Sequence, residues 1–148
     1  AIQWAGWVWR GIAVWDKMNS RPQIGRFRQQ CEYIVWGSNG PLPTKRGVSV
    51  LPGLFQVPNV PTQDRWHQTQ KPLALMQQVV RICEPGGTII DPFAGSGSTI
   101  VAALCEGYKA VGIEQEAHYI DIIRRRMQSV QLRMVLPDTT LQSRIEGI

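Results

Sequence analysis

The sequence lacks the features that mark membrane, secreted and metal-binding proteins. No apolar run approaches the roughly 20 residues of a membrane-spanning helix, and no charged-then-apolar leader resembles a signal peptide. The cysteines Cys31, Cys83 and Cys105 form no C-x-x-C pair and stand near no histidine cluster, so no metal site is predicted. We expect a soluble cytoplasmic protein, without a membrane partner, whose thiols are reduced and mostly buried.

Length and charge limit the fold class and the partner. A chain of 148 residues with 43% hydrophobic and 18% charged residues is ordinary for one globular domain, here residues 1–148. The formal net charge of +5 and the pI near 9.5 favour a polyanionic partner. Basic side chains in two loops can reach phosphates: Arg21, Arg26, Arg28, Lys45 and Arg46. Residues 124–126 are three further arginines on a predicted helix, where we expect a solvated face.

The first 70 residues predict a strand pair followed by a long loop. We expect core packing rather than base stacking for the tryptophans Trp4, Trp7, Trp9 and Trp15. The stretches 11–15 and 31–36 are typical of strands, and the loop between them predicts an antiparallel pair within residues 1–40. Residues 41–70 contain five prolines and little periodicity, which predicts a long connection and a target-recognition segment.

Residues 71–130 predict alternating helices and strands. Pro72 begins a helix that ends at residues 84–87, and its buried face is expected to carry Leu73, Met76, Val80 and Cys83. A strand ending at Asp91, a helix from Thr99, a strand over 109–113 and a helix over 117–130 follow. The order strand, helix, strand predicts an α/β fold with a parallel crossover.

A glycine-rich turn lies between the strand that ends at Asp91 and the next helix. Gly95 and Gly97 let main-chain N–H groups approach a ligand closely. Glu114 ends the following strand nineteen residues after Gly95, as in sites that bind an adenosine ribose. The Gly-Lys-Ser/Thr of a phosphate-binding loop is absent, and Ile100 occupies the third glycine position of G-x-G-x-x-G. S-adenosylmethionine, an adenosine cofactor without a phosphate, fits this pattern.

Three motifs in order make the pattern more specific. They are His67-Gln68-Thr69-Gln70-Lys71-Pro72, Asp91-Pro92-Phe93-Ala94-Gly95-Ser96-Gly97-Ser98-Thr99 and Gly112-Ile113-Glu114. They closely resemble the motifs of the S-adenosylmethionine-dependent amino-methyltransferases of DNA. Residues 14–17 and 31–35 also resemble the last two strands of that family's catalytic half, so the resemblance runs from about residue 6 to about residue 127.

The resemblance implies an activity and a partner. In the family's permuted subclass the catalytic strands precede the cofactor motif, and this chain corresponds to the C-terminal half. The implied reaction is methyl transfer to the exocyclic amine of adenine, the preferred target, or of cytosine, in double-stranded DNA. Restriction-modification in a bacterium or phage is the implied setting.

The resemblance also implies a role for each matching residue. Asp91 would bind the methionine ammonium, Phe93 would pack on the cofactor, and Gly95, Ser96 and Gly97 would give close backbone access. Glu114 would hold the ribose. Thr69 and Lys71 would approach the methionine carboxylate. Gln68 and Ser98 replace the proline and threonine frequent in the family.

One family motif is absent. The catalytic signature, an Asp, Asn or Ser followed by Pro-Pro and an aromatic residue, does not occur in this sequence, so catalytic residues cannot be named. We therefore expect a Rossmann-like methyltransferase sheet with helices on both faces that is incomplete, since the catalytic strand and its neighbour are missing. The strand over 88–93 would then have an open edge, which favours a homodimer or a complementing N-terminal chain. The alternative is a non-catalytic module that binds cofactor or DNA.

Overall fold

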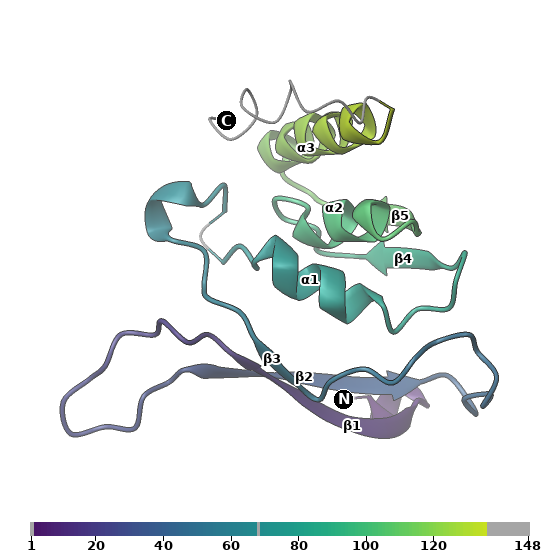
Figure 1. Cartoon of the computed structure of the whole chain (residues 1–148), viewed down its shortest axis with the longest axis horizontal. Helices are drawn as coiled ribbons and strands as arrows, with labels where there is room; N and C mark the ends of the chain where they lie inside the picture. Colours follow the sequence, from purple (N-terminus) through teal and green to yellow (C-terminus); the bar gives the residue numbers. More distant parts are fainter. Residues whose placement is uncertain (1, 68, 136–148) are drawn as a thin grey trace.

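The computed structural model describes residues 2–67 and 69–135 (Figure 1). Its strands are β1 (Val8–Asp16), β2 (Cys31–Ser38), β3 (Leu54–Gln56), β4 (Thr88–Asp91) and β5 (Lys109–Gly112). Its α-helices are α1 (Leu73–Val80), α2 (Ser98–Cys105) and α3 (Ala117–Val135), and its short 3-10 helices are η1 (Gln3–Ala5) and η2 (Thr62–Asp64). Gln68 lies outside the described residues. No helix within these ranges is long and apolar enough to cross a membrane.

The first sheet has the order β2-β1-β3. β1 and β2 pair antiparallel, with Trp15 opposite Glu32, so the predicted strand pair is confirmed. β3 pairs parallel with the carboxyl end of β1, and this strand was not predicted from the sequence. Three strand residues between a glycine and a valine-proline step are too few to show a period of two, and pairing with β1 makes them a strand.

The core of this sheet forms under α1. Trp15, Phe55, Val57 and Leu75 form one buried cluster, and the Trp15 indole N–H donates to the carbonyl oxygen of Val57 at 2.8 Å. The prediction of core packing is therefore confirmed for Trp15, which is 2% exposed. It is wrong for Trp4, Trp7 and Trp9, which are 95%, 47% and 44% exposed. Leu75 of α1 packs on Trp15, near the carboxyl end of β1. Trp4 and Trp7 precede β1, and Trp9 lies at its opposite end.

The second sheet contains β4 and β5 in parallel, with α2 connecting them, as the strand-helix-strand order predicts. Ile100 of α2 and Ile123 of α3 pack with Ala94, and Ala110 of β5 lies against this cluster. Ile90 and Val111 pair across the two strands and are 65% and 49% exposed, because no described helix covers their side of the sheet.

Two local expectations are corrected. α1 ends at Val80, before the predicted stop, because the N–H groups of Ile82 and Cys83 bond to carbonyls three residues back rather than four. The predicted burial of the thiols is wrong for Cys31 and Cys105, which are exposed, and Cys83 is half-buried. All three cysteines are free, as expected for reduced thiols.

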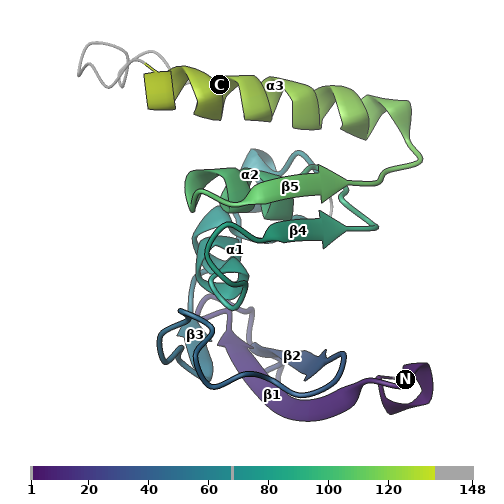
Figure 2. The same cartoon turned by 90° about the vertical axis from the view of Figure 1, so that its right-hand side faces the viewer.

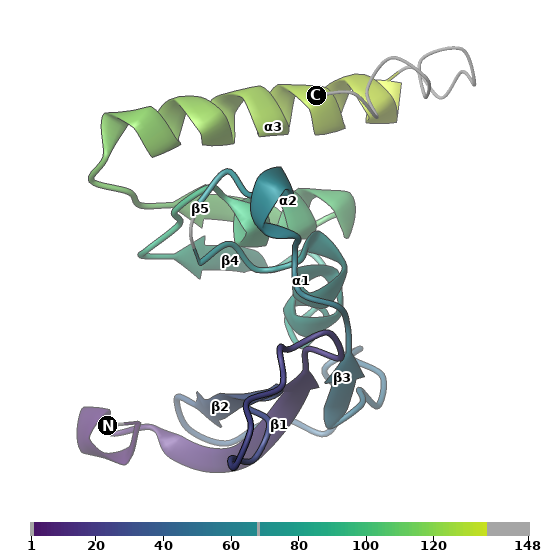
Figure 3. The same cartoon turned by 90° about the vertical axis from the view of Figure 1, so that its left-hand side faces the viewer.

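The two sheets lie apart, with α1 between them (Figures 2 and 3). α1 packs against α2, and Arg81, the residue after α1, binds Glu106, the residue after α2, at 2.7 Å. β4 is the strand of its sheet nearer to the three-stranded sheet. Within the described part of the chain, β2 and β4 each pair with one strand only, so the expected open edge of β4 is present.

Candidate functional site

A hollow of about 230 Å³ lies at the carboxyl end of β4. Six of the eight predicted cofactor residues line it: Thr69, Lys71, Asp91, Phe93, Gly95 and Ser96. The other two stand behind this lining, where Gly97 contacts α3 and Glu114 binds the glycine-rich turn. Residues from two motifs, about twenty positions apart, thus meet at one end of the second sheet.

The glycine-rich turn has a backbone that other residues rarely adopt. Gly95 and Gly97 have φ values of +52° and +80°. A Cβ atom on Gly97 would lie 2.7 Å from Cγ1 of Ile123, so α3 packs directly on this backbone. The N–H of Gly97 donates to the carbonyl oxygen of Ala94 at 2.7 Å, which closes the turn. Glycine at position 97 is required by both conformation and space.

Asp91 and Phe93 stand at the mouth of the hollow. One carboxylate oxygen of Asp91 accepts the backbone N–H of Phe93 at 3.0 Å, which leaves the second oxygen for another donor. The Phe93 side chain is 88% exposed. An apolar ring next to a carboxylate suits a ligand that carries a cation and a flat apolar group.

Glu114 fixes the glycine-rich turn from β5. Its Oε2 accepts the N–H of Gly95 at 2.8 Å, and its Oε1 accepts the N–H groups of Gln115 and Glu116 at 2.8 and 3.0 Å. The bond from Glu116 and then the bond from Gly95 hold the pKa of Glu114 below its ordinary value, because amide donors stabilise the carboxylate. Glu114 is therefore ionised at neutral pH, and its role in the loop is one that the sequence did not predict.

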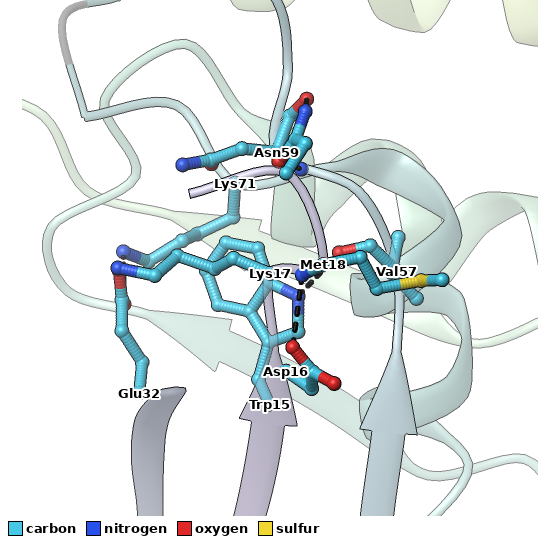
Figure 4. A network of polar contacts seen from close by, with 9 residues as sticks. Trp15, Asp16, Lys17, Met18, Glu32, Val57, Asn59 and Lys71 are labelled. Carbon is cyan, nitrogen blue, oxygen red and sulfur yellow. Dashed lines mark hydrogen bonds and ion pairs between the residues drawn. The ribbon is translucent and has the colours of Figure 1, made fainter. Parts of the chain in front are cut away.

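Lys71 joins the hollow to the three-stranded sheet (Figure 4). Its ammonium donates to Glu32 of β2 at 2.8 Å and lies 5.5 Å from the centre of the Trp15 ring. Lys17 approaches the other oxygen of Glu32 at 3.6 Å. The expected partner of Lys71 was a ligand carboxylate, and in this structure a protein carboxylate binds it. Glu32 was not singled out from the sequence because it is distant along the chain.

Two further residues contact the lining of the hollow, and one of them, His67, also belongs to that lining. Nδ1 of His67 accepts the N–H of Thr69 at 3.1 Å, and the His67 ring packs on Tyr119 of α3 with centroids 4.6 Å apart. Arg126 of α3 donates to the carbonyl oxygen of Ser96. The prediction of a solvated arginine face is therefore wrong for Arg126, which is half-buried. It holds for the neighbouring arginines, since both are exposed.

The predicted DNA-contacting residues form two separate groups. Arg21, Arg26 and Arg28 are exposed on the loop over 17–30, at the carboxyl end of β1. Lys45 and Arg46 lie on the loop after β2, at the other end of that sheet (Figure 1). The Arg46 side chain is 15% exposed, because it donates to the carbonyl of Ile82 at 3.0 Å and lies 3.9 Å from Glu84. The structure therefore gives Arg46 an intrachain role.

Comparisons of the sequence find relatives that are named methylases or methyltransferases. YubD of Escherichia coli (strain K12), which is named a methylase, is 35% identical over 109 residues, 73% of this chain and 45% of that protein. The Type II methyltransferase M2.MboI of Moraxella bovis is 28% identical over 135 residues, 80% of this chain and 50% of that protein. The chain therefore spans about half the length of these curated relatives.

Among solved structures, the M1.HpyAVI–SAM complex matches with a TM-score of 0.70 and 27% identity, over 85% of this chain and 65% of that one. The cytosine-N4-specific PvuII DNA methyltransferase matches with a TM-score of 0.68 and 20% identity, over 90% and 60%, which shows a shared fold. The sequence model of the DNA methylase family matches residues 1–125. This chain belongs to the N6/N4 DNA methylase family.

Proposed function

We propose that this chain supplies the S-adenosylmethionine-binding part of a DNA amino-methyltransferase. The observation that carries the proposal is the hollow beside β4, where Thr69, Lys71, Asp91 and the glycine-rich turn come together. The likeness to the M1.HpyAVI–SAM complex supports the same cofactor.

The chemistry of the hollow fits the parts of this cofactor. The unused oxygen of Asp91 suits the methionine ammonium, and Thr69 and Lys71 suit the methionine carboxylate. The hydroxyl of Ser98 is buried in the lining without a hydrogen-bond partner among the described residues, so it can bind a ligand atom. The hollow is smaller than the roughly 300 Å³ at which sites for whole ligands begin. It therefore takes part of the cofactor, and the exposed ring of Phe93 packs on the rest.

The residues of this chain bind and orient in the proposed reaction. When bound, S-adenosylmethionine would supply an electrophilic methyl group for transfer to the exocyclic amine of a flipped base. Lys71 and Asp91 fix the charged end of the cofactor, and Glu114 fixes the turn beneath it and accepts hydrogen bonds from the ribose. The groups that would hold the target amine belong to the catalytic signature, which is not in this sequence.

Calorimetric titration with S-adenosylmethionine tests the cofactor assignment. We expect Asp91→Asn to weaken binding by about tenfold or more, because a charge-assisted contact to the ammonium is lost. Asp121→Asn is the matched control, since Asp121 is an exposed acid on α3 that pairs with Arg124 at 3.1 Å and does not line the hollow. Equal affinities for the wild type and Asp91→Asn would contradict the assignment.

We propose adenine N6 as the target amine, with cytosine N4 as the alternative. The family includes both chemistries. Mass spectrometry of DNA methylated by the completed enzyme distinguishes N6-methyladenine from N4-methylcytosine. Methyl transfer by this chain alone would contradict the proposal that the catalytic element lies elsewhere, and no transfer by the completed enzyme would favour a non-catalytic module.

The loop over 17–30 is the proposed DNA contact. It lies at the same end of the three-stranded sheet as Glu32, which binds Lys71 of the hollow. Its arginines flank Ile24 and Phe27, whose side chains are fully or almost fully exposed. Replacing Arg21, Arg26 or Arg28 with glutamine should weaken DNA binding and lower the salt dependence by about one phosphate contact each. Lys45→Gln tests the second predicted group in the same way, and Arg125→Gln, which removes an exposed arginine of α3, is the control and should change neither.

The open edges of β2 and β4 support completion by another polypeptide segment or by a second copy of this chain. The side of β4 and β5 that no described helix covers also supports this proposal, because its apolar residues Ile90 and Val111 are exposed. Light scattering of the isolated chain should show association, and Ile90→Lys should reduce it by placing a charge on that surface. A wild-type chain that is a stable, cooperatively melting monomer would contradict this proposal.

A further inference from the structure

Helix α3 contacts the glycine-rich turn and the hollow at three points. Tyr119 packs on His67, Ile123 is the residue that a Cβ on Gly97 would meet, and Arg126 donates to Ser96. These three residues are spaced by four and three positions, so they share one face of the helix. α3 therefore supports the site from behind, with two packing contacts and one charged hydrogen bond.

The contact of Arg126 differs from those of the arginines beside it. Its Nη1 donates to the carbonyl oxygen of Ser96 and lies 3.4 Å from the Ser96 hydroxyl, and Ser96 is 3% exposed. Within the described ranges, Arg126 has no carboxylate at ion-pair distance, and burial lowers its pKa. An arginine side chain still keeps its proton, so a partly desolvated cation is bound by the carbonyl oxygen and the hydroxyl of Ser96.

We propose that Arg126 is a positioning residue for the cofactor, because it ties Ser96 to α3 and thereby holds the turn formed by Gly95, Ser96 and Gly97. This inference rests on the proposed function of the hollow. Two glycines with positive φ make the turn costly to order, since glycine loses more conformational freedom than any other residue. Glu114 holds the turn at the N–H of Gly95, and Arg126 holds it at the carbonyl of Ser96. The backbone is thus fixed from both sides before a ligand binds.

Three variants of the full chain test this role by calorimetry with S-adenosylmethionine. Arg126→Gln should weaken binding by about tenfold, the effect of losing a charge-assisted hydrogen bond. Arg126→Lys keeps a charge and a donor and should restore part of the affinity. Arg125→Gln removes an exposed charge one position away on the same helix and should leave the affinity unchanged.

Amide hydrogen exchange at Gly97, measured without cofactor, gives a second readout. The N–H of Gly97 is held by Ala94 at 2.7 Å, and it should exchange faster in Arg126→Gln and at the wild-type rate in Arg125→Gln. Unchanged affinity and unchanged exchange in Arg126→Gln would overturn the proposal. If that variant does not fold, Arg126→Met, which keeps the apolar stem of the side chain but has no donor, takes its place, and wild-type affinity and exchange in Arg126→Met would overturn the proposal. If the wild type does not bind S-adenosylmethionine, the proposed function fails, and Gly97 exchange still decides whether Arg126 holds the turn.

Discussion

The three-stranded sheet and the second sheet are stabilised by opposite means. In the three-stranded sheet, the Trp15 side chain fills the space under α1, and its indole N–H donates to the carbonyl oxygen of Val57, 42 positions away. In the second, the absence of a side chain at Gly97 lets α3 pack on the backbone, and Glu114 accepts the N–H of Gly95, 19 positions away. The first region is stabilised by a large side chain that packs between segments far apart in the sequence. The second is stabilised by the backbone conformation of its glycine-rich turn.

The proposed ligand sites of the two regions differ in the same way. The glycine-rich turn exposes backbone and carboxylate groups toward the hollow, and its shape is fixed by contacts within the region. The three-stranded sheet presents its polar contacts at the loop over 17–30 and through Glu32, which reaches the hollow only by way of Lys71. This ion pair is one direct polar link between the two regions.

The largest expected effect is a loss of stability when the core of the three-stranded sheet is disrupted. Trp15→Ala should lower the free energy of unfolding by about 3–5 kcal/mol, because it removes a fully buried aromatic side chain and its hydrogen bond. Chemical denaturation with fluorescence and circular dichroism measures the change. Cofactor affinity, measured below the melting temperature, should change much less, since Trp15 belongs to a different cluster from Ile100 and Ile123. An equal loss of affinity would show that the regions do not act separately.

The next largest effect is a loss of stability when the glycine-rich turn of the second sheet is disrupted. Gly97→Ala should cost about 1–2 kcal/mol for the left-handed backbone and about 1–3 kcal/mol more for overlap with Ile123. Gly107→Ala is the matched control, because Gly107 has a similar φ of +79° and nothing within 4 Å of its Cβ position. Thermal unfolding of both variants isolates the overlap as their difference. Equal destabilisation by the two changes would contradict the close approach of α3.

A pH profile sharpens the role of Glu114. Its folded-state pKa is lowered by amide donors, so its contribution is present at neutral pH and is lost as the pH falls below the ordinary glutamate range. Cofactor affinity and stability should both decline on acidification in the wild type. Glu114→Gln cannot titrate and should flatten that part of the profile. Identical pH profiles for the wild type and Glu114→Gln would contradict the role of ionised Glu114 in holding the glycine-rich turn.

The smallest effect concerns the link between the regions. Lys71→Met should change stability by about 1 kcal/mol or less, because both partners of its ion pair are more than a third exposed. It should nevertheless weaken cofactor binding in calorimetry, since Lys71 lines the hollow. Lys17→Met is the control, because Lys17 contacts the same Glu32 at 3.6 Å and does not line the hollow. Equal effects of the two changes on affinity would contradict a role for Lys71 at the site.

Much of the second region was predictable because its signals are local. The turn from β4 to α2 is encoded by adjacent small residues, and hydrophobic spacing marks the helix that follows. The predicted cofactor residues lie within three short motifs, and six of the eight line the hollow. The first region was less predictable, because β3 becomes a strand only by pairing with β1, and exposure of Trp7 or Trp9 depends on how far α1 reaches.

The sequence by itself determined the family, the order of the strand-helix-strand unit and the residue types at the candidate site, since these depend on neighbours along the chain. Only the tertiary structure decided that Lys71 binds Glu32, that Arg126 holds Ser96 and that Arg46 turns back onto Ile82. Those contacts join residues 30 or more positions apart. A charged side chain binds the partner that tertiary packing places beside it, and a local sequence pattern does not predict which residue that is.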